Sequence, residues 1–154
     1  ARLEDTKIVL ITDAAGLDKA SVRRGLEIMD ANNGEVWAKL DAGTKEYFRQ
    51  VNRTSVKFQR ILGNLCTTAK ARPILIQSLF LKIHGEPMSR QELEAYCGHL
   101  NDITAAGGQI REVQAYTVAR PAPEAFATRL TKEELEEMTG VICESTGLKV
   151  ETYD

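Results

Sequence analysis

Polar side chains stand at the ends of several short apolar segments of this chain. They are Thr12 and Asp13, then Lys39, Asp41 and Thr44, then Gln77 and Ser78, and finally Gln114, Tyr116, Thr117 and Arg120. Side chains at positions i and i+2 of a strand share a face, so Lys39 and Asp41 point the same way, as do Gln114 and Tyr116. Burying such groups without partners costs roughly 2–7 kcal/mol each. They must therefore find hydrogen-bond partners or face a ligand.

Two interpretations of these residues stay open from their spacing. Lys39 and Asp41 could form an ion pair that closes one end of a sheet, and Gln77 could cap a loop carbonyl. Alternatively, the ammonium, carboxylate, amide and phenol groups form one ligand site, because together they can donate and accept hydrogen bonds and bind an ionic group. Taken as a set, the polar residues at the strand ends favour the ligand site.

The elements that position these residues are apolar runs that alternate with segments of helical period. The runs occupy residues 7–12, 35–40, 73–83 and 109–118, with a weaker one at 148–153. This alternation indicates βα units in which the first four strands are mainly parallel. Such units form either a doubly wound sheet or part of a barrel, and both bind ligands at the C-terminal ends of the strands.

The intervening helices show apolar stripes and clear end signals. The stripes are Val22, Leu26 and Met29, then Phe58, Leu62, Leu65 and Ala69, then Leu93, Tyr96, Cys97 and Leu100. Ser89 with Glu92 and Thr131 with Glu134 have the spacing of a capping box, which predicts two helix starts. Asn33-Gly34, Gly107-Gly108 and Gly147 predict helix ends.

Composition and charge narrow the class of protein. The chain has 154 residues, 43% of them hydrophobic, which predicts a single domain over residues 1–154. The 20 Lys and Arg nearly balance the 22 Asp and Glu, so nucleic acid is not an expected partner. No run approaches the roughly 18 apolar residues of a membrane span, and the start ARLEDTK lacks a signal-peptide core. We expect a cytoplasmic protein without a membrane partner.

Familiar cofactor motifs do not occur in the sequence. Cys66, Cys97 and Cys143 have no CxxC spacing, and neither His84 nor His99 has a partner at the spacing of metal ligands. The turn DAAG at residues 13–16 is neither a dinucleotide-binding loop nor a P-loop. The sequence therefore predicts no metal site in this chain.

Four stretches resemble the later part of a radical S-adenosylmethionine (radical SAM) protein. They are LITDAAGLDKASVRRGLEIM (10–29), GEVWAKLDAGTKEYFRQVNR (34–53), SVKFQRILGNL (55–65) and PILIQSLFLKI (73–83). The superfamily commonly has a TNG turn, an SLD segment followed by a helix of the EEYFRxINR kind, and a strand like ILIQSLF, in this order. The most specific match is LDAGTKEYFRQVNR. The resemblance implies a partial parallel (βα) barrel segment of about four parallel strands plus a short C-terminal strand, with helices on the outer face.

The resemblance lacks the superfamily's two cofactor motifs. The CxxxCxxC loop that binds a [4Fe–4S] cluster and the GGEP-like turn that contacts the methionine amino group do not occur. The chain thus resembles strands three to six of such a barrel and is expected to be an excised piece or a truncated relative. S-adenosylmethionine and the cluster are expected in the intact parent and not on this chain, because the scattered cysteines cannot form a cluster loop.

The resemblance also selects six of the polar strand-end residues as site residues and implies a role for each. Thr12 takes the place of the TNG threonine near S-adenosylmethionine, although Asp13 replaces the asparagine. Lys39 stands where many members have serine and could pair with the methionine carboxylate or an acidic substrate. Asp41 would accept hydrogen bonds from ribose hydroxyls or orient Lys39. Gln77, Gln114 and Tyr116 would line the cavity toward substrate and adenine.

Two functional hypotheses follow. In the first, the intact parent cleaves S-adenosylmethionine reductively and abstracts hydrogen from an unidentified small-molecule or peptide substrate, while this chain alone is inactive. In the second, the chain is a non-catalytic α/β binding or interaction module that has lost the cofactor. In either case a partial barrel exposes strand edges, and the edge of the strand at residues 7–12 predicts a homo-oligomer.

Overall fold

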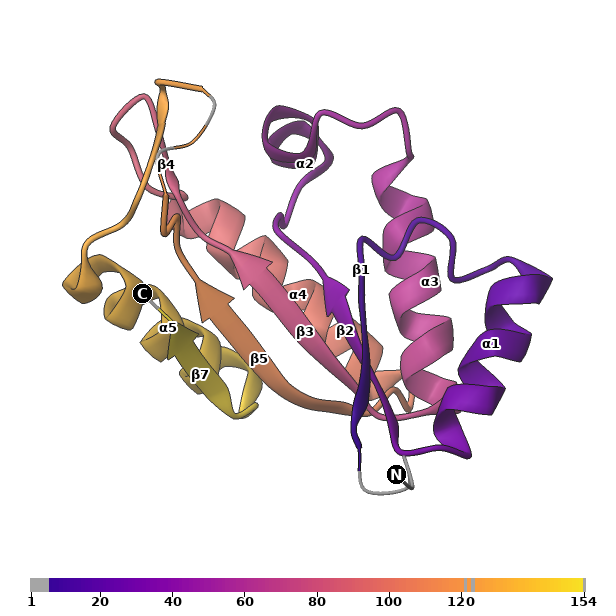
Figure 1. Cartoon of the computed structure of the whole chain (residues 1–154). Coiled ribbons are helices and arrows are strands. Elements are labelled where there is room, and N and C mark those ends of the chain that lie inside the picture. The colour runs from indigo at the N-terminus through magenta and orange to yellow at the C-terminus, as the bar shows by residue number, and fades with distance from the viewer. Residues whose placement is uncertain (1–5, 121, 123, 154) are drawn as a thin grey trace.

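The computed structural model describes residues 6–120, 122 and 124–153, and it is built around a five-stranded sheet (Figure 1). The elements in chain order are β1 (Ile8–Thr12), α1 (Ala20–Asp30), β2 (Gly34–Lys39), α2 (Lys45–Asn52), α3 (Phe58–Ala71), β3 (Ile74–Leu79), β4 (Lys82–Ile83), α4 (Arg90–Ala105), β5 (Ile110–Tyr116), β6 (Ala127–Thr128), α5 (Lys132–Thr146) and β7 (Val150–Tyr153). The sheet has the order β1-β2-β3-β5-β7, and all its neighbours are parallel. The predicted partial parallel βα arrangement is confirmed.

The strand order explains where the helices lie. Each crossover leads to the next strand in the same direction, and right-handed crossovers of this kind place their helices on one face of a sheet. Figure 1 shows α3, α4 and α5 on one side of the sheet, with α2 beyond the C-terminal end of β2. Among the described residues, no helix is both long and apolar enough to cross a membrane.

The helix-covered face of the sheet forms the core. Its central strand residues are at most 2% exposed and comprise Val36, Ala38, Ile74, Ile76, Val113 and Ala115. The predicted stripes pack against them through Leu26, Leu65 and Leu100. Burying one such large aliphatic side chain contributes about 1.5–3 kcal/mol, which makes this face the main source of stability.

The prediction of one strand over residues 73–83 is wrong. β3 ends at Leu79, and β4 pairs antiparallel with β6 in a separate two-stranded sheet. The reason lies in the neighbouring strand, because β2 has already ended at Lys39 and the Leu79 N–H donates to the Asp41 carboxylate at 2.8 Å. The apolar run continues because Phe80 is fully buried against Tyr96, not because the strand continues.

One of the two predicted capping boxes forms in full. At the start of α5, Thr131 Oγ1 accepts from the Glu134 N–H at 3.2 Å, and Glu134 accepts from the Thr131 N–H at 2.7 Å. At the start of α4, Ser89 accepts from the Glu92 N–H, but the Glu92 carboxylate turns away to the loop after β2. The prediction of the second capping box is therefore only half correct, because the Glu92 side chain makes a tertiary contact instead of bonding to the Ser89 backbone.

A β-bulge in β5 changes the open face of the sheet. Ile110 pairs with Ile74, whereas Glu112 pairs with Leu75, so Arg111 is an extra residue in the ladder. A bulge sets two consecutive side chains on one side of a strand. Arg111 and Glu112 accordingly both bond to residues of the open face, and two charges lie next to each other there.

Candidate functional site

Residues of four neighbouring strands lie side by side in rows on the open face of the sheet. The middle row consists of Lys39, Gln77, Gln114 and Glu151. The next row toward the C-terminal ends contains Leu79, Tyr116 and Tyr153. Three of the six predicted site residues therefore share one row and Tyr116 lies in the next, although their strands are far apart in the sequence.

Lys39 connects the two rows to the loop after β2. Its Nζ donates to the Tyr116 hydroxyl at 2.6 Å and lies 3.7 Å from the Asp41 carboxylate. Burial alone lowers the pKa of Lys39, but the charge of Asp41 and the Tyr116 hydrogen bond outweigh it, so the net pKa is raised. Lys39 thus remains a cation, and the ion pair considered from the sequence is present.

Asp41 is fixed more rigidly than Lys39, because its side chain is 3% exposed. One oxygen accepts from the Leu79 N–H at 2.8 Å, and the other accepts from Asn52 Nδ2 at 3.2 Å. Burial raises the pKa of Asp41 above its ordinary value, and Lys39 and the two donors offset this in part. Among the described residues, Asn52 Oδ1 is a buried atom without a hydrogen-bond partner. This corner can accept a donor from a ligand or water.

The turn after β2 is held from behind by α4. Glu92 Oε1 accepts from the N–H groups of Gly43 and Thr44 at 2.5 and 2.8 Å, and His99 Nε2 lies 2.8 Å from the Gly43 carbonyl oxygen. A Cβ on Gly43 would lie 2.2 Å from the Glu92 carbonyl oxygen. Sequence reasoning gave Glu92 and His99 no such role, although positions 92, 96 and 99 share one helix face.

The glutamines form a short amide ladder in the middle row. Gln77 Nε2 donates to Gln114 Oε1 at 3.4 Å, and Gln114 Nε2 donates to Glu112 Oε1 at 3.3 Å. Thr12 lies apart from this group, because it is in register with Ala38, which faces the helices. Its hydroxyl accepts from the Ala14 N–H at 3.1 Å. The predicted contact of Thr12 with a cofactor stays a prediction.

Trp37 and residues of these two rows line a cavity of about 410 Å³ that opens on this face of the sheet. Its lining consists of Trp37, Gln77, Gln114, Tyr116, Thr117, Ala119 and Tyr153. Sequence reasoning did not include Trp37 or Tyr153 in the site. Trp37 precedes Lys39 by two residues and so shares its face, a signal that was present in the alternation of β2.

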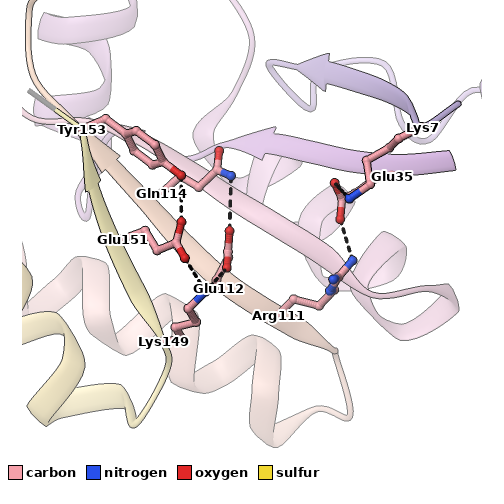
Figure 2. A network of polar contacts seen from close by, with 8 residues as sticks. All are labelled: Lys7, Glu35, Arg111, Glu112, Gln114, Lys149, Glu151 and Tyr153. Atoms are coloured by element: carbon pink, nitrogen blue, oxygen red, sulfur yellow. Dashed lines mark hydrogen bonds and ion pairs between the residues drawn. The ribbon is translucent and has the colours of Figure 1, made fainter.

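Below the cavity, toward the N-terminal ends of the strands, the charged groups are paired (Figure 2). Glu35 is 7% exposed and accepts from Lys7 at 3.2 Å, Trp37 Nε1 at 2.9 Å and Arg111 at 2.5 Å. Burial acts to raise the pKa of Glu35, but these donors outweigh it and the net pKa is lowered. Figure 2 shows a second group in which Lys149 bridges Glu112 and Glu151.

The described residues do not fit an iron–sulfur cluster. Cys66 lies half-buried on α3, Cys97 is buried on α4, and Cys143 is exposed on α5. Burial raises the pKa of the Cys97 thiol, whereas a cluster ligand must be a thiolate. Within the described part of the chain, no three His, Cys, Asp or Glu side chains are grouped so that they could hold a metal ion.

Comparisons with known proteins identify the fold. No family model and no curated protein matches the sequence. A crystal structure of a domain of pyruvate-formate lyase-activating enzyme from Bacteroides vulgatus is similar, with a TM-score of 0.70 and 12% identity over 93% of this chain and 79% of that one. The chain shares the fold of that domain. A radical SAM methyltransferase from Sphaerobacter thermophilus matches 95% of this chain with a TM-score of 0.67 and 13% identity.

These matches confirm the fold that the resemblance in the sequence implied. They extend over nearly the whole chain, which in turn spans 40% of the methyltransferase. At such low identity the likeness concerns the fold, and function has to be argued from the site.

Proposed function

We propose that this chain is the substrate-side part of a radical SAM enzyme, which cleaves S-adenosylmethionine reductively and abstracts hydrogen from a substrate. The observation that carries the proposal is the polar row on the open face, at the ligand-binding ends of the strands of a radical SAM fold. Lys39, Gln77 and Gln114 place one cation and two amides side by side there, which suits the binding of a polar ligand.

The cluster has no place among the described residues, so the proposal assigns its ligands to a part of the parent enzyme outside this sequence. When bound, a [4Fe–4S] cluster supplies the electron for reductive cleavage of S-adenosylmethionine. The residues of this chain bind and orient S-adenosylmethionine and the substrate. We assign them no electron transfer.

Lys39 has the clearest role within this proposal. Its ammonium is suited to a carboxylate, either that of S-adenosylmethionine or that of an acidic substrate. The Tyr116 hydroxyl, whose ring lines the cavity, accepts from the ammonium at 2.6 Å, and Asp41 keeps the ammonium charged. Gln77 and Gln114 supply uncharged donors and acceptors beside it. The row therefore offers two neighbouring subsites, one that binds an anionic group and one that binds a neutral group.

The second candidate function, a non-catalytic binding or interaction module, is favoured by one observation. Lys39 already has both Asp41 and Tyr116 as partners, so this part of the open face is satisfied without a ligand. In that case Lys39 would stabilise the fold and would not contact S-adenosylmethionine.

Anaerobic binding measurements on this chain distinguish the two candidates. We expect S-adenosylmethionine to bind weakly, with a Kd of about 1 mM or above, because the cluster that normally chelates its methionine moiety is missing. Lys39→Ala should abolish this binding, whereas Lys45→Ala, an exposed lysine on α2, should leave it unchanged.

Three results would contradict the proposal. They are equal binding by the wild type and Lys39→Ala, micromolar affinity of the chain alone, and a stoichiometric cluster after reconstitution with iron and sulfide. The first would favour the non-catalytic module. The other two would show that the cofactor site is complete within this chain.

A further inference from the structure

The side chains that line the cavity on the open face are uncharged, and five of the seven are aromatic rings or amides. Trp37, Tyr116 and Tyr153 provide aromatic rings, and Gln77 and Gln114 provide amides between them. These residues come from β2, β3, β5 and β7, so the cavity depends on four strands in register. Its volume of about 410 Å³ is in the range of small-molecule sites.

The polar atom of each of these rings is held by a hydrogen bond. Trp37 Nε1 donates to Glu35 at 2.9 Å, and the Tyr153 hydroxyl donates to Glu151 at 2.8 Å, as Figure 2 shows for the latter. The Tyr116 hydroxyl accepts from Lys39 at 2.6 Å. Because the polar tips are occupied, the rings offer their apolar surfaces to the cavity and are fixed in orientation.

The amide of Gln77 has unused hydrogen-bonding capacity. One Nε2 hydrogen points to Gln114 at the long distance of 3.4 Å, which leaves the second hydrogen and Oε1 without partners among the described residues. A carboxamide of this kind presents a donor and an acceptor side by side. The same pair of groups lets glutamine recognise the edge of a nucleobase.

The ions behind the cavity wall are already neutralised. Glu35 is paired with Lys7 and Arg111. Glu112 and Glu151 share Lys149. A charged group of a ligand would therefore find no unpaired counterion among these residues.

We propose that this cavity binds a planar, uncharged heteroaromatic ring whose edge carries both a hydrogen-bond donor and an acceptor. The rings of Trp37, Tyr116 and Tyr153 supply stacking surface, and Gln77 reads the edge of the ligand. Stacking on aromatic side chains tolerates many planar rings, so the amide provides the selectivity. That the ring belongs to the substrate rests on the proposed function.

The chain contains its own reporter for this test, because Trp37 is its only tryptophan. Hypoxanthine, a neutral ring with a lactam edge, serves as the probe. We expect it to quench Trp37 fluorescence in a saturable way. Gln77→Leu should weaken its binding about tenfold or more, the discrimination typical of a bidentate amide contact. Gln91→Leu makes the same change at an exposed position of α4 and should have no effect.

Two further probes test the proposal. Benzyl alcohol tests whether the edge of the ring is recognised, and S-adenosylmethionine tests whether the ring comes from the substrate or the cofactor. The ring of benzyl alcohol is planar and neutral but has no lactam edge, so this compound should bind much more weakly than hypoxanthine. If benzyl alcohol binds as strongly as hypoxanthine, the proposal that Gln77 recognises the edge of the ring is wrong. If S-adenosylmethionine displaces hypoxanthine at equal concentration, the ring is the adenine of the cofactor and the assignment to the substrate is wrong.

If hypoxanthine does not quench the Trp37 fluorescence of the wild type, the cavity proposal as a whole is wrong. It would leave the proposed function standing, because that depends on Lys39 and S-adenosylmethionine. Tyr153→Ala provides a second variant should Gln77→Leu fold poorly, because Tyr153 is 49% exposed. It removes stacking surface and should also weaken hypoxanthine binding, and unchanged binding would contradict the proposal.

Discussion

The two faces of the sheet are built from the same strands and differ in almost every physical property. Ala38 and Ile76 face the helices and are fully buried, whereas their chain neighbours Lys39 and Gln77 face the open side with hydrogen-bonding groups. One face is apolar and tightly packed. The other is a series of polar rows around a cavity. Alternation along a strand thus separates the residues that stabilise the fold from those available to a ligand.

The open face also shows how a polar surface can persist on a partial barrel. Its buried carboxylates, Glu35 and Asp41, each accept several hydrogen bonds and have a cation nearby. The open face therefore does not depend on being covered. Substitutions there should change binding and pH dependence more than folding, and substitutions on the helix-covered face should do the reverse.

The largest difference between the faces should come from removing one aliphatic side chain from each. Ile76→Ala should lower the free energy of unfolding by about 2–5 kcal/mol, because it leaves a cavity in the core. Ile11→Ala removes the same atoms on the open side, where Ile11 is 58% exposed, and should cost much less. Urea denaturation measures both, and equal losses would contradict the assignment of stability to one face.

The turn that positions Asp41 should be sensitive to added volume. Gly43→Ala should lower the free energy of unfolding by about 1–3 kcal/mol, because its Cβ would meet the backbone of α4. Gly63→Ala is the matched control in α3, where nothing lies within 4 Å of the new Cβ, and should be stabilising by about 0.5–1 kcal/mol. Thermal unfolding followed by circular dichroism compares them. A neutral Gly43→Ala would mean that the turn is not pressed against α4.

Glu35→Gln tests the paired charges of the open face and should cost about 1–2 kcal/mol at neutral pH. The pKa of Glu35 is lower in the folded protein than its ordinary value of 4.5. The stability it contributes is therefore present above that value and is lost as the pH falls through the folded-state pKa.

The difference in stability between the wild type and Glu35→Gln should accordingly shrink from about pH 6 to about pH 3. Denaturant titrations over this range test the sign. A constant difference would show that the carboxylate charge does not matter and that only the shape of the side chain does.

Association should be the mildest effect. Among the described residues, no strand covers the outer edge of β1, where Ile8 and Ile11 are 45% and 58% exposed. We propose that a second copy pairs along this edge, because open edges attract other strands. Light scattering should show a dimer or larger assembly, and Ile11→Lys should favour the monomer. A monomeric wild type at high concentration would contradict this.

Sequence reasoning recovered the parts of the molecule that depend on local pattern. The alternation of apolar runs and helical stripes predicted the parallel βα order, and the spacing of Thr131 and Glu134 predicted a real capping box. The shared faces of Lys39 with Asp41 and of Gln114 with Tyr116 brought polar groups to one side of the sheet. These features need only the period of the backbone.

What the sequence could not supply depends on contacts between distant residues. The Glu92 carboxylate does not complete its capping box but accepts from the N–H of Thr44, 48 residues earlier in the chain. The bulge at Arg111 follows from the register of β5 with β3. The apolar run at residues 73–83 does not form one strand, because the neighbouring strand β2 ends at Lys39. Trp37 and Tyr153 entered the cavity because β2 and β7 flank β3 and β5.

The central claim is that this chain forms part of a radical SAM enzyme. Its most direct test is formation of 5′-deoxyadenosine by the protein encoded by the complete gene, purified and assayed anaerobically with S-adenosylmethionine and a reductant. We predict that the protein contains a CxxxCxxC segment before this sequence and forms 5′-deoxyadenosine. Lys39→Ala should lower the rate about tenfold or more, equivalent to ~1.4 kcal/mol, while Lys45→Ala should not. A complete protein without that segment and without 5′-deoxyadenosine formation would contradict the claim.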